Sequence, residues 1–188
     1  MKKQIILLLL LFTTLAAWSQ DVTMDSKTQK EMLRQQKKAA RAEEKAQKAL
    51  MVDMMVRHAT FVLEADMLFN KYGNGTPVSS NINFVASDSL TGILQVGSGL
   101  YLGSNGVGGV TVEGRIIAYE YTHNDKRGYY NITYSLATAT GTYDIVMSVS
   151  ADGHADATIR SNWPGSLRYS GKLVLPGQSK VYKGYSRY

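Results

Sequence analysis

Hydrophobic and polar residues alternate along most of the chain after residue 58. A period of two is typical of antiparallel strands that bury one face and expose the other. Turn-forming pairs such as Thr140-Gly141 and Asp152-Gly153 separate the alternating runs and favour hairpins. The pattern predicts eight strands, at residues 61–69, 82–86, 90–96, 110–118, 130–136, 143–149, 155–159 and 167–175.

Residues 21–58 have a different pattern, because they contain neither glycine nor proline and are rich in Lys, Gln, Ala, Glu and Met. Asp25 or Ser26 can cap a helix N-terminus, so we predict one helix at residues 26–56. Only its last turns, with three methionines at residues 51–55, are apolar enough to pack firmly on the strands. The expected pairs four positions apart on the helix are Glu31 with Gln35, Glu43 with Gln47, and Glu44 with Lys48.

No segment after residue 58 is long enough for the helical crossover that parallel strands require. The fold class is therefore mainly β: an antiparallel eight-stranded barrel or sandwich with meander connections, preceded by one long N-terminal α-helix. The alternation alone leaves barrel and sandwich open. An outer-membrane barrel is disfavoured, because the run at residues 82–86 is shorter than the roughly 9 to 11 residues of a spanning strand.

The first twenty residues have the layout of a secretory signal peptide. Two lysines precede a short apolar run, and small residues at Ala17 and Ser19 favour cleavage after Ser19. The apolar run is shorter than the about 20 residues of a membrane-spanning helix, so we expect no transmembrane segment after cleavage. The protein is thus expected to be periplasmic or otherwise exported. The expected divisions are the signal peptide (1–19), a charged Ala-rich helical extension (20–58), an antiparallel β-domain (59–176) and a basic, aromatic tail (177–188).

Composition narrows the range of functions. The formal net charge is +6, but two of the lysines lie in the signal peptide. Residues 21–58 hold nine basic and six acidic residues, whereas residues 59–188 hold ten and nine. A nearly neutral β-domain does not favour nucleic-acid binding. The chain has no cysteine, so neither disulfides nor thiol chemistry can contribute, and an ordinary hydrophobic core must support the fold.

Several short motifs along the β-domain form a distinctive set: Phe61, Ala65, Asp66, Gly114-Arg115-Ile116, Lys126 to Ile132, Tyr143-Asp144-Ile145, Asp152-Gly153-His154-Ala155 and Leu167 to Gly171. These motifs resemble those of an uncharacterised envelope-protein family of Gram-negative bacteria, the domain of unknown function 4251. The resemblance extends from residue 52 to about residue 176 and implies the fold and secretion, but no activity. One segment departs from the family pattern: a glycine-rich stretch at residues 97–109 replaces an expected Leu-Pro-Tyr-like segment.

The residue types needed for catalysis or metal binding are present without a recognisable arrangement. The three histidines, His58, His123 and His154, are far apart in sequence, and the glycine-rich stretch lacks the lysine and the following helix of a phosphate-binding loop. No nucleophile-elbow motif occurs. We therefore expect no enzyme, no metal and no cofactor. The less favoured alternative is a hydrolase using carboxylates, of which Glu64 with Asp66 or Glu113 with Glu120 are the candidate pairs.

Tyrosine is the unusual component of the β-domain, since all 12 tyrosines follow residue 58. Tyrosine both favours strands and can line a ligand cavity with hydroxyl groups. The leading hypothesis is a non-enzymatic exported β-domain that binds a small ligand or a protein partner at one end of its sheet, with Tyr101, Asn105 and Tyr119 as ligand contacts. A cavity lined by tyrosines without internal partners would favour a small ligand, and a fully packed interior would disfavour it.

Two other contacts are also predicted. In the alternative hypothesis, the protein is an envelope structural or assembly protein that docks on a partner through its N-terminal helix. Residues 180–188 mix basic and aromatic side chains and are expected to fray or to contact an anionic envelope surface peripherally.

Overall fold

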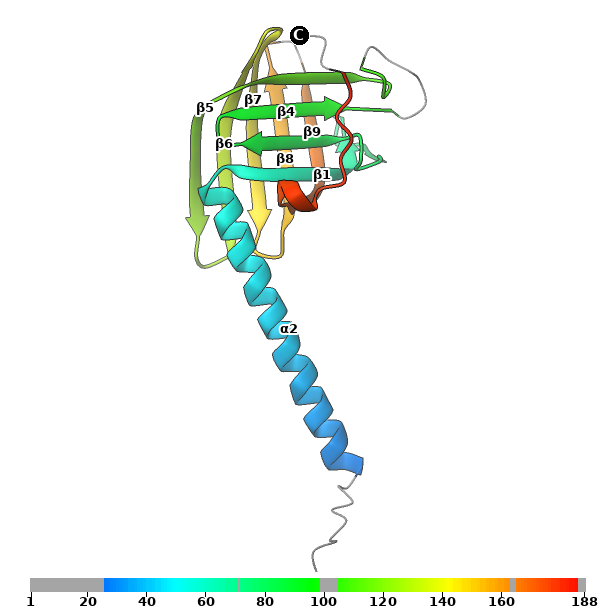
Figure 1. The fold of residues 1–188 in the computed structure, drawn as a ribbon, viewed down its shortest axis with the longest axis vertical. Helices are drawn as coiled ribbons and strands as arrows, with labels where there is room; N and C mark the ends of the chain where they lie inside the picture. The colour runs from blue at the N-terminus through cyan, green and yellow to red at the C-terminus, as the bar shows by residue number, and fades with distance from the viewer. Residues whose placement is uncertain (1–25, 71, 99–104, 163–164, 186–188) are drawn as a thin grey trace, which may run out of the picture. The chain divides into compact units, whose positions relative to one another are not determined.

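The computed structural model describes residues 26–70, 72–98, 105–162 and 165–185. It contains one long helix, α2 (Ser26–Arg57), followed by nine antiparallel strands (Figure 1). The strands are β1 (Thr60–Phe69), β2 (Gly75–Pro77), β3 (Phe84–Asp88), β4 (Thr91–Val96), β5 (Val110–Asn124), β6 (Tyr129–Thr138), β7 (Gly141–Ser150), β8 (His154–Ser161) and β9 (Ser166–Val174).

Each of the eight strands predicted from the alternation is present, and they form a closed barrel rather than a sandwich. Consecutive strands pair from β3 to β9, β1 pairs with β3, and the pairing of β1 with β9 closes the ring. The extra strand, β2, was not predicted. It pairs with only Met67 to Phe69 of β1, and all three of its residues are exposed, so it has no buried face that alternation could reveal.

The helix has the predicted extent to within one residue. Two of the predicted pairs are present: Lys48 Nζ lies 2.8 Å from Glu44 Oε1, and Gln47 Nε2 donates to Glu43 Oε1 at 3.4 Å. The chain divides into two compact units, residues 1–42 and 43–188. In the first unit, residues 26–42 are helical, and each of them is exposed to solvent. In the second, the last turns of α2 bury Val52, Met55 and Val56.

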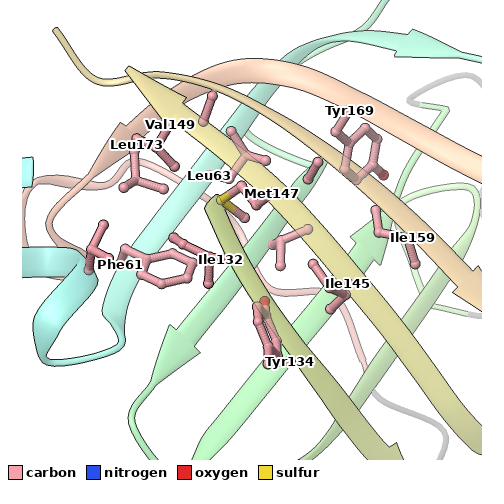
Figure 2. Close-up of a cluster of buried hydrophobic side chains, with 14 of the residues drawn as sticks. Phe61, Leu63, Ile132, Tyr134, Ile145, Met147, Val149, Ile159, Tyr169 and Leu173 are labelled. Atoms are coloured by element: carbon pink, nitrogen blue, oxygen red, sulfur yellow. The ribbon is translucent and has the colours of Figure 1, made fainter. Parts of the chain in front are cut away.

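The core fills the barrel with alternate side chains of its eight strands and with the last turns of α2. Outward-facing positions between them, such as Asn131, Thr133 and Asp144, are exposed and polar, as the alternation predicts. Figure 2 shows part of this core, with Phe61, Leu63, Ile132, Tyr134, Ile145, Met147, Val149, Ile159, Tyr169 and Leu173 labelled.

A β-bulge changes the face that β5 presents to the core. Between Ile117 and Glu120, β5 has one residue more than the facing segment of β6, and Ala118 adopts a φ of 52°. The extra residue shifts the alternation by one, so Ile116 is buried before the bulge and Tyr119 packs on the core after it. Regular alternation through the predicted strand at residues 110–118 would place Ala118 on the inward face with Ile116. That position is wrong, because a regular period cannot anticipate a bulge.

The last described residues form a strap along the barrel, drawn in red in Figure 1. We call residues 179–185 the C-terminal strap. It follows a short 3-10 turn, η2 (Pro176–Gln178), and makes hydrogen bonds with residues on β1, β4 and the loop before β3. These bonds hold residues 180–185 in place, so the expected frayed tail was wrong for this part of the chain.

Candidate ligand pocket at one end of the barrel

An apolar pocket of about 370 Å³ opens at the end of the barrel where β4 ends and β5 begins. Its walls come from five strands, because inward-facing side chains at the ends of β4, β5, β7, β8 and β9 converge there. The lining residues are Leu94, Val96, Val110, Val112, Tyr143, Ile159, Ser161, Gly165, Ser166 and Leu167.

The chemistry of the pocket is mainly hydrophobic. Aliphatic side chains form most of its wall, and Val110, at the start of β5, is 55% exposed at its rim. The polar groups of the lining belong to Tyr143, Ser161 and Ser166, and the lining includes no charged residue. Such a pocket suits an uncharged, largely apolar group with a few hydrogen-bonding atoms.

Elsewhere in the barrel, the described inward side chains form the hydrophobic core, and most of the core tyrosine hydroxyls have internal partners. The exception is Tyr134, whose buried hydroxyl has no hydrogen-bond partner within the part of the chain that the structure describes. Burial raises the pKa of both Tyr134 and Tyr169, which keeps both phenols neutral. The three partnered bonds are Tyr119 to the Val56 carbonyl (2.7 Å), Tyr130 to Asp53 Oδ1 (2.7 Å) and Tyr169 to the Gln95 carbonyl (2.8 Å).

Of the predicted contact residues, Asn105 and Tyr119 do not line this pocket. Tyr101 lies outside the described residues. Tyr119 packs against Tyr134, with ring centroids 5.9 Å apart, and its hydroxyl is bonded to the end of α2. Asn105 is 2% exposed, and its side chain is engaged on both sides. Its amide nitrogen donates to Thr111 Oγ1 at 3.0 Å, and its Oδ1 accepts from the backbone of Val107 and Gly109.

The glycine-rich stretch at residues 97–109 is described at both of its ends. Gly109 approaches the backbone of β4 closely, since a Cβ there would lie 2.0 Å from the Val96 carbonyl oxygen. Gly106 and Gly108 have φ values of 76° and 77°, which glycine adopts without strain. These glycines therefore have a structural role in fastening the loop to β4, together with Asn105.

The carboxylates and histidines form no metal cluster among the residues that the structure describes. In each proposed carboxylate pair, one member contacts the C-terminal strap. Glu64 accepts hydrogen bonds from the strap, and Glu113 forms an ion pair with Lys183 at 2.5 Å. The exposed Asp66 and Glu120 have no such partner in the described ranges.

One surface group on β8 and β9 has the residue types of a hydrolytic triad but not its geometry. His154 Nε2 lies 3.4 Å from Ser170 Oγ and 3.9 Å from Asp156 Oδ2. In a working triad, the serine and the carboxylate contact opposite nitrogens of the imidazole. Here, the same nitrogen faces both groups, and His154 is exposed. Asp156 also pairs with Arg168 at 3.2 Å. The arrangement does not activate the serine.

Sequence reasoning missed the residues that line the pocket, because strand periodicity shows which side chains face inward but not where the interior is left open. One signal was available: Val96 and Val110 are apolar residues that flank a glycine-rich loop. An inward apolar residue at a strand end, beside a loop without bulky side chains, is a candidate for a barrel mouth.

Comparison with known proteins identifies a family whose model matches this chain. The family model of a domain of unknown function (DUF4251) matches residues 43–173. The chain is also similar to the crystal structure of a DUF4251 family protein from Bacteroides eggerthii DSM 20697, with 30% identity and a TM-score of 0.60. That match covers 70% of this chain and 90% of that chain. No protein with a curated description matches the chain.

Proposed function

Because the chain belongs to the DUF4251 family, whose description names no activity, we propose its function from geometry: the barrel binds a small, uncharged, mainly apolar ligand at its open end. The supporting observation is the pocket of about 370 Å³, which lies within the size range of small-molecule sites. In this proposal, the protein acts as a binding module and not as an enzyme.

The shape of the barrel supports a site at this end. The other end receives the last turns of α2, where Val52, Met55 and Val56 join the core. A ligand that enters at this end displaces water from the aliphatic side chains of the pocket when it binds. Burial of apolar surface contributes about 25 cal/mol per Å², so even a ligand of modest size gains useful affinity.

The full chain can be titrated with the uncharged dye N-phenyl-1-naphthylamine, whose fluorescence rises in apolar surroundings. We expect saturable binding that Val110→Asp weakens by at least about tenfold, because a carboxylate is placed in the apolar entrance. Val146→Asp is the matched control, since Val146 is 49% exposed on another strand and does not line the pocket. Equal binding by both variants would contradict the proposal.

We propose further that the protein works after export, in the periplasm or beyond it. The support is the signal-peptide layout of residues 1–19, which lie outside the described part of the structure. Among the described residues, no helix is both long enough and apolar enough to cross a membrane. The test is N-terminal sequencing of the protein from the cell envelope, which should begin at Gln20. A chain that begins at Met1 and stays with the cytoplasmic fraction would refute export.

A second candidate function is docking on a protein partner through α2. It is supported by four large apolar side chains that the helix exposes to solvent. A photo-crosslinker placed at Leu50 should give a discrete adduct in cells, and Met54→Gln should reduce it. The dye titration is independent of this outcome, so the two candidates can be separated. The exposed residues are Met32, Leu33, Leu50 and Met54.

A further inference from the structure

A pair of hollows, separate from the apolar pocket, lies where the end of α2 meets the turn between β7 and β8. Their volumes are about 510 and 260 Å³, and they share Asp152 in their linings. We call the two together the basic groove. Its cationic side chains come from three separate segments of the chain: Lys45 and Lys48 on α2, Arg127 before β6 and Lys172 on β9.

The basic groove has more positive charge than the surrounding structure neutralises. Lys48 pairs with Glu44 at 2.8 Å. Lys45, Arg127 and Lys172 have no ion pair within the described ranges, and all three are exposed. Asp152 is the one acidic residue in the two linings. Three cationic groups are therefore accessible to an anionic ligand.

The backbone between these cations is fixed by hydrogen bonds. Ala151 N donates to the Gly128 carbonyl at 3.1 Å, which joins the turn that carries Arg127 to the turn after β7. Leu173 N donates to the Gly153 carbonyl at 2.8 Å, which joins the same turn to β9 beside Lys172. Gly153 is buried against α2, with a φ of 87°. The positions of the cations are thus set by the fold and do not require ordering of a loop.

The acidic residue of the groove stabilises the turn. Asp152 Oδ1 accepts a short hydrogen bond from Ser150 Oγ and a bond of 3.3 Å from the backbone nitrogen of His154. The bond from Ser150, followed by that from His154, lowers the pKa of Asp152. Its charge opposes an anionic ligand, and this makes Asp152 a useful position for a test.

We propose that the basic groove binds a ligand with two or more phosphate groups. Phosphate oxygens accept hydrogen bonds from Lys and Arg, and charge-assisted bonds of this kind are stronger than neutral ones. Two hollows with cations in each fit two anionic groups better than one. Met51, Met55 and Leu175 line the smaller hollow, so an apolar portion of the ligand can also be accommodated. The proposal does not depend on the pocket at the other end of the barrel.

The full chain can be tested by calorimetry with sodium pyrophosphate and by co-sedimentation with vesicles that contain cardiolipin, whose headgroup carries two phosphates, using phosphatidylcholine vesicles as the neutral comparison. We expect the combined variant Lys45→Gln, Arg127→Gln and Lys172→Gln to lose at least tenfold in affinity, because each cation beside an anionic surface contributes about fivefold. Binding to pyrophosphate would identify phosphate groups alone as sufficient, whereas binding only to the anionic vesicles would identify a lipid headgroup.

The matched control is Lys37→Gln, Arg115→Gln and Arg160→Gln, which removes the same charge from exposed positions outside the groove. It should bind within about twofold of the unmodified protein, because only the groove cations contact the ligand in this proposal. An equal loss in both triple variants would overturn the proposal, as would the absence of binding to both pyrophosphate and anionic vesicles.

Asp152→Asn gives a second test in the opposite direction. The amide oxygen can still accept the bonds that hold the turn, while the negative charge is removed. We expect pyrophosphate to bind about threefold to tenfold more tightly, because a repulsive charge close to the ligand is lost. Unchanged or weaker binding by a variant with an unchanged melting temperature would overturn the proposal.

Discussion

The hydroxyl of Tyr119 donates a hydrogen bond of 2.7 Å to the carbonyl oxygen of Val56, in the last turn of α2. Tyr119 can reach this carbonyl because the bulge at Ala118 turns it toward the core. The carbonyl also accepts a bond from Ala59 N at 3.2 Å. The bulge in β5 and the end of the helix are therefore linked, although they are 63 residues apart in the sequence.

Tyr119→Phe should lower the free energy of unfolding by about 1 kcal/mol, because the ring stays in place and one partly buried hydrogen bond is lost. Urea unfolding measures the change. Tyr121→Phe is the control, since Tyr121 is 38% exposed and a surface change of this kind stays within about 0.5 kcal/mol. A larger loss from the control would contradict the importance of the bond to Val56.

Tyr134→Phe should have the opposite effect. The Tyr134 hydroxyl is buried without a partner among the described residues, and a buried unpaired hydroxyl destabilises the folded state. We expect the variant to be about 1 kcal/mol more stable than the parent in urea unfolding. Lower stability would indicate that the hydroxyl has a partner, such as an internal water molecule. Tyr169→Phe is the contrasting variant, because it removes a bond of 2.8 Å and should destabilise.

Much of the fold could be predicted from the sequence, since the burial of every second residue of a barrel strand produces an alternation of apolar and polar residues. All eight barrel strands were anticipated from alternation, and the helix was bounded by its composition. Features that produce no such alternation could not be predicted. β2 buries no residue, and the bulge at Ala118 interrupts the period. Closure by β1 and β9 depends on strand tilt and register, which periodicity does not contain.

The candidate site was less predictable than the fold. Tyrosine content suggested a lined cavity, but the structure uses the hydroxyls of Tyr119, Tyr130 and Tyr169 for internal bonds. The apolar pocket instead exists because inward side chains at five strand ends leave space between them. A ligand role for Tyr101, Asn105 and Tyr119 stays a prediction. The structure explains Asn105 and Tyr119 through the bonds that each makes within the barrel.

Gln95 connects the C-terminal strap to the barrel, and its loss should release the strap. Its Nε2 donates to the Tyr182 carbonyl at 2.8 Å, and its Oε1 accepts from Gly184 N at 2.7 Å. Gln95→Leu removes both bonds and leaves the Tyr182 carbonyl and the Gly184 amide without these partners, so we expect the free energy of unfolding to fall by about 2 kcal/mol. Hydrogen exchange at the Gly184 amide should also accelerate by at least about tenfold.

Gln178→Leu is the control for this change, because Gln178 is exposed in η2 and precedes the strap. It should leave the Gly184 exchange rate nearly unchanged. If Gln95→Leu lowers stability but Gly184 remains protected, the strap is held by its other contacts. Those contacts include the bonds from Ser179 and Lys180 to Glu64, the ion pair of Lys183 with Glu113, and the backbone bonds from Tyr182 N to the Asn81 carbonyl and from Tyr185 N to the Asn105 carbonyl.

Asp53 should make stability depend on pH in the acidic range. The side-chain bond from Arg57 Nε (2.7 Å), followed by that from the Tyr130 hydroxyl, lowers the pKa of Asp53 below its ordinary value of 3.8. The folded state therefore binds this proton less readily than the unfolded chain, so the stabilisation is present above pH 3.8 and is lost as pH falls through the lowered pKa. Asp53→Asn should destabilise at neutral pH, and the difference from the parent should shrink on acidification as the parent carboxyl becomes neutral. Urea unfolding at several pH values measures this convergence. Asp66→Asn, on the exposed side of β1, should differ little from the parent in free energy of unfolding at every pH. If Asp53→Asn is less stable than the parent by the same amount at every pH, packing and not charge explains its effect.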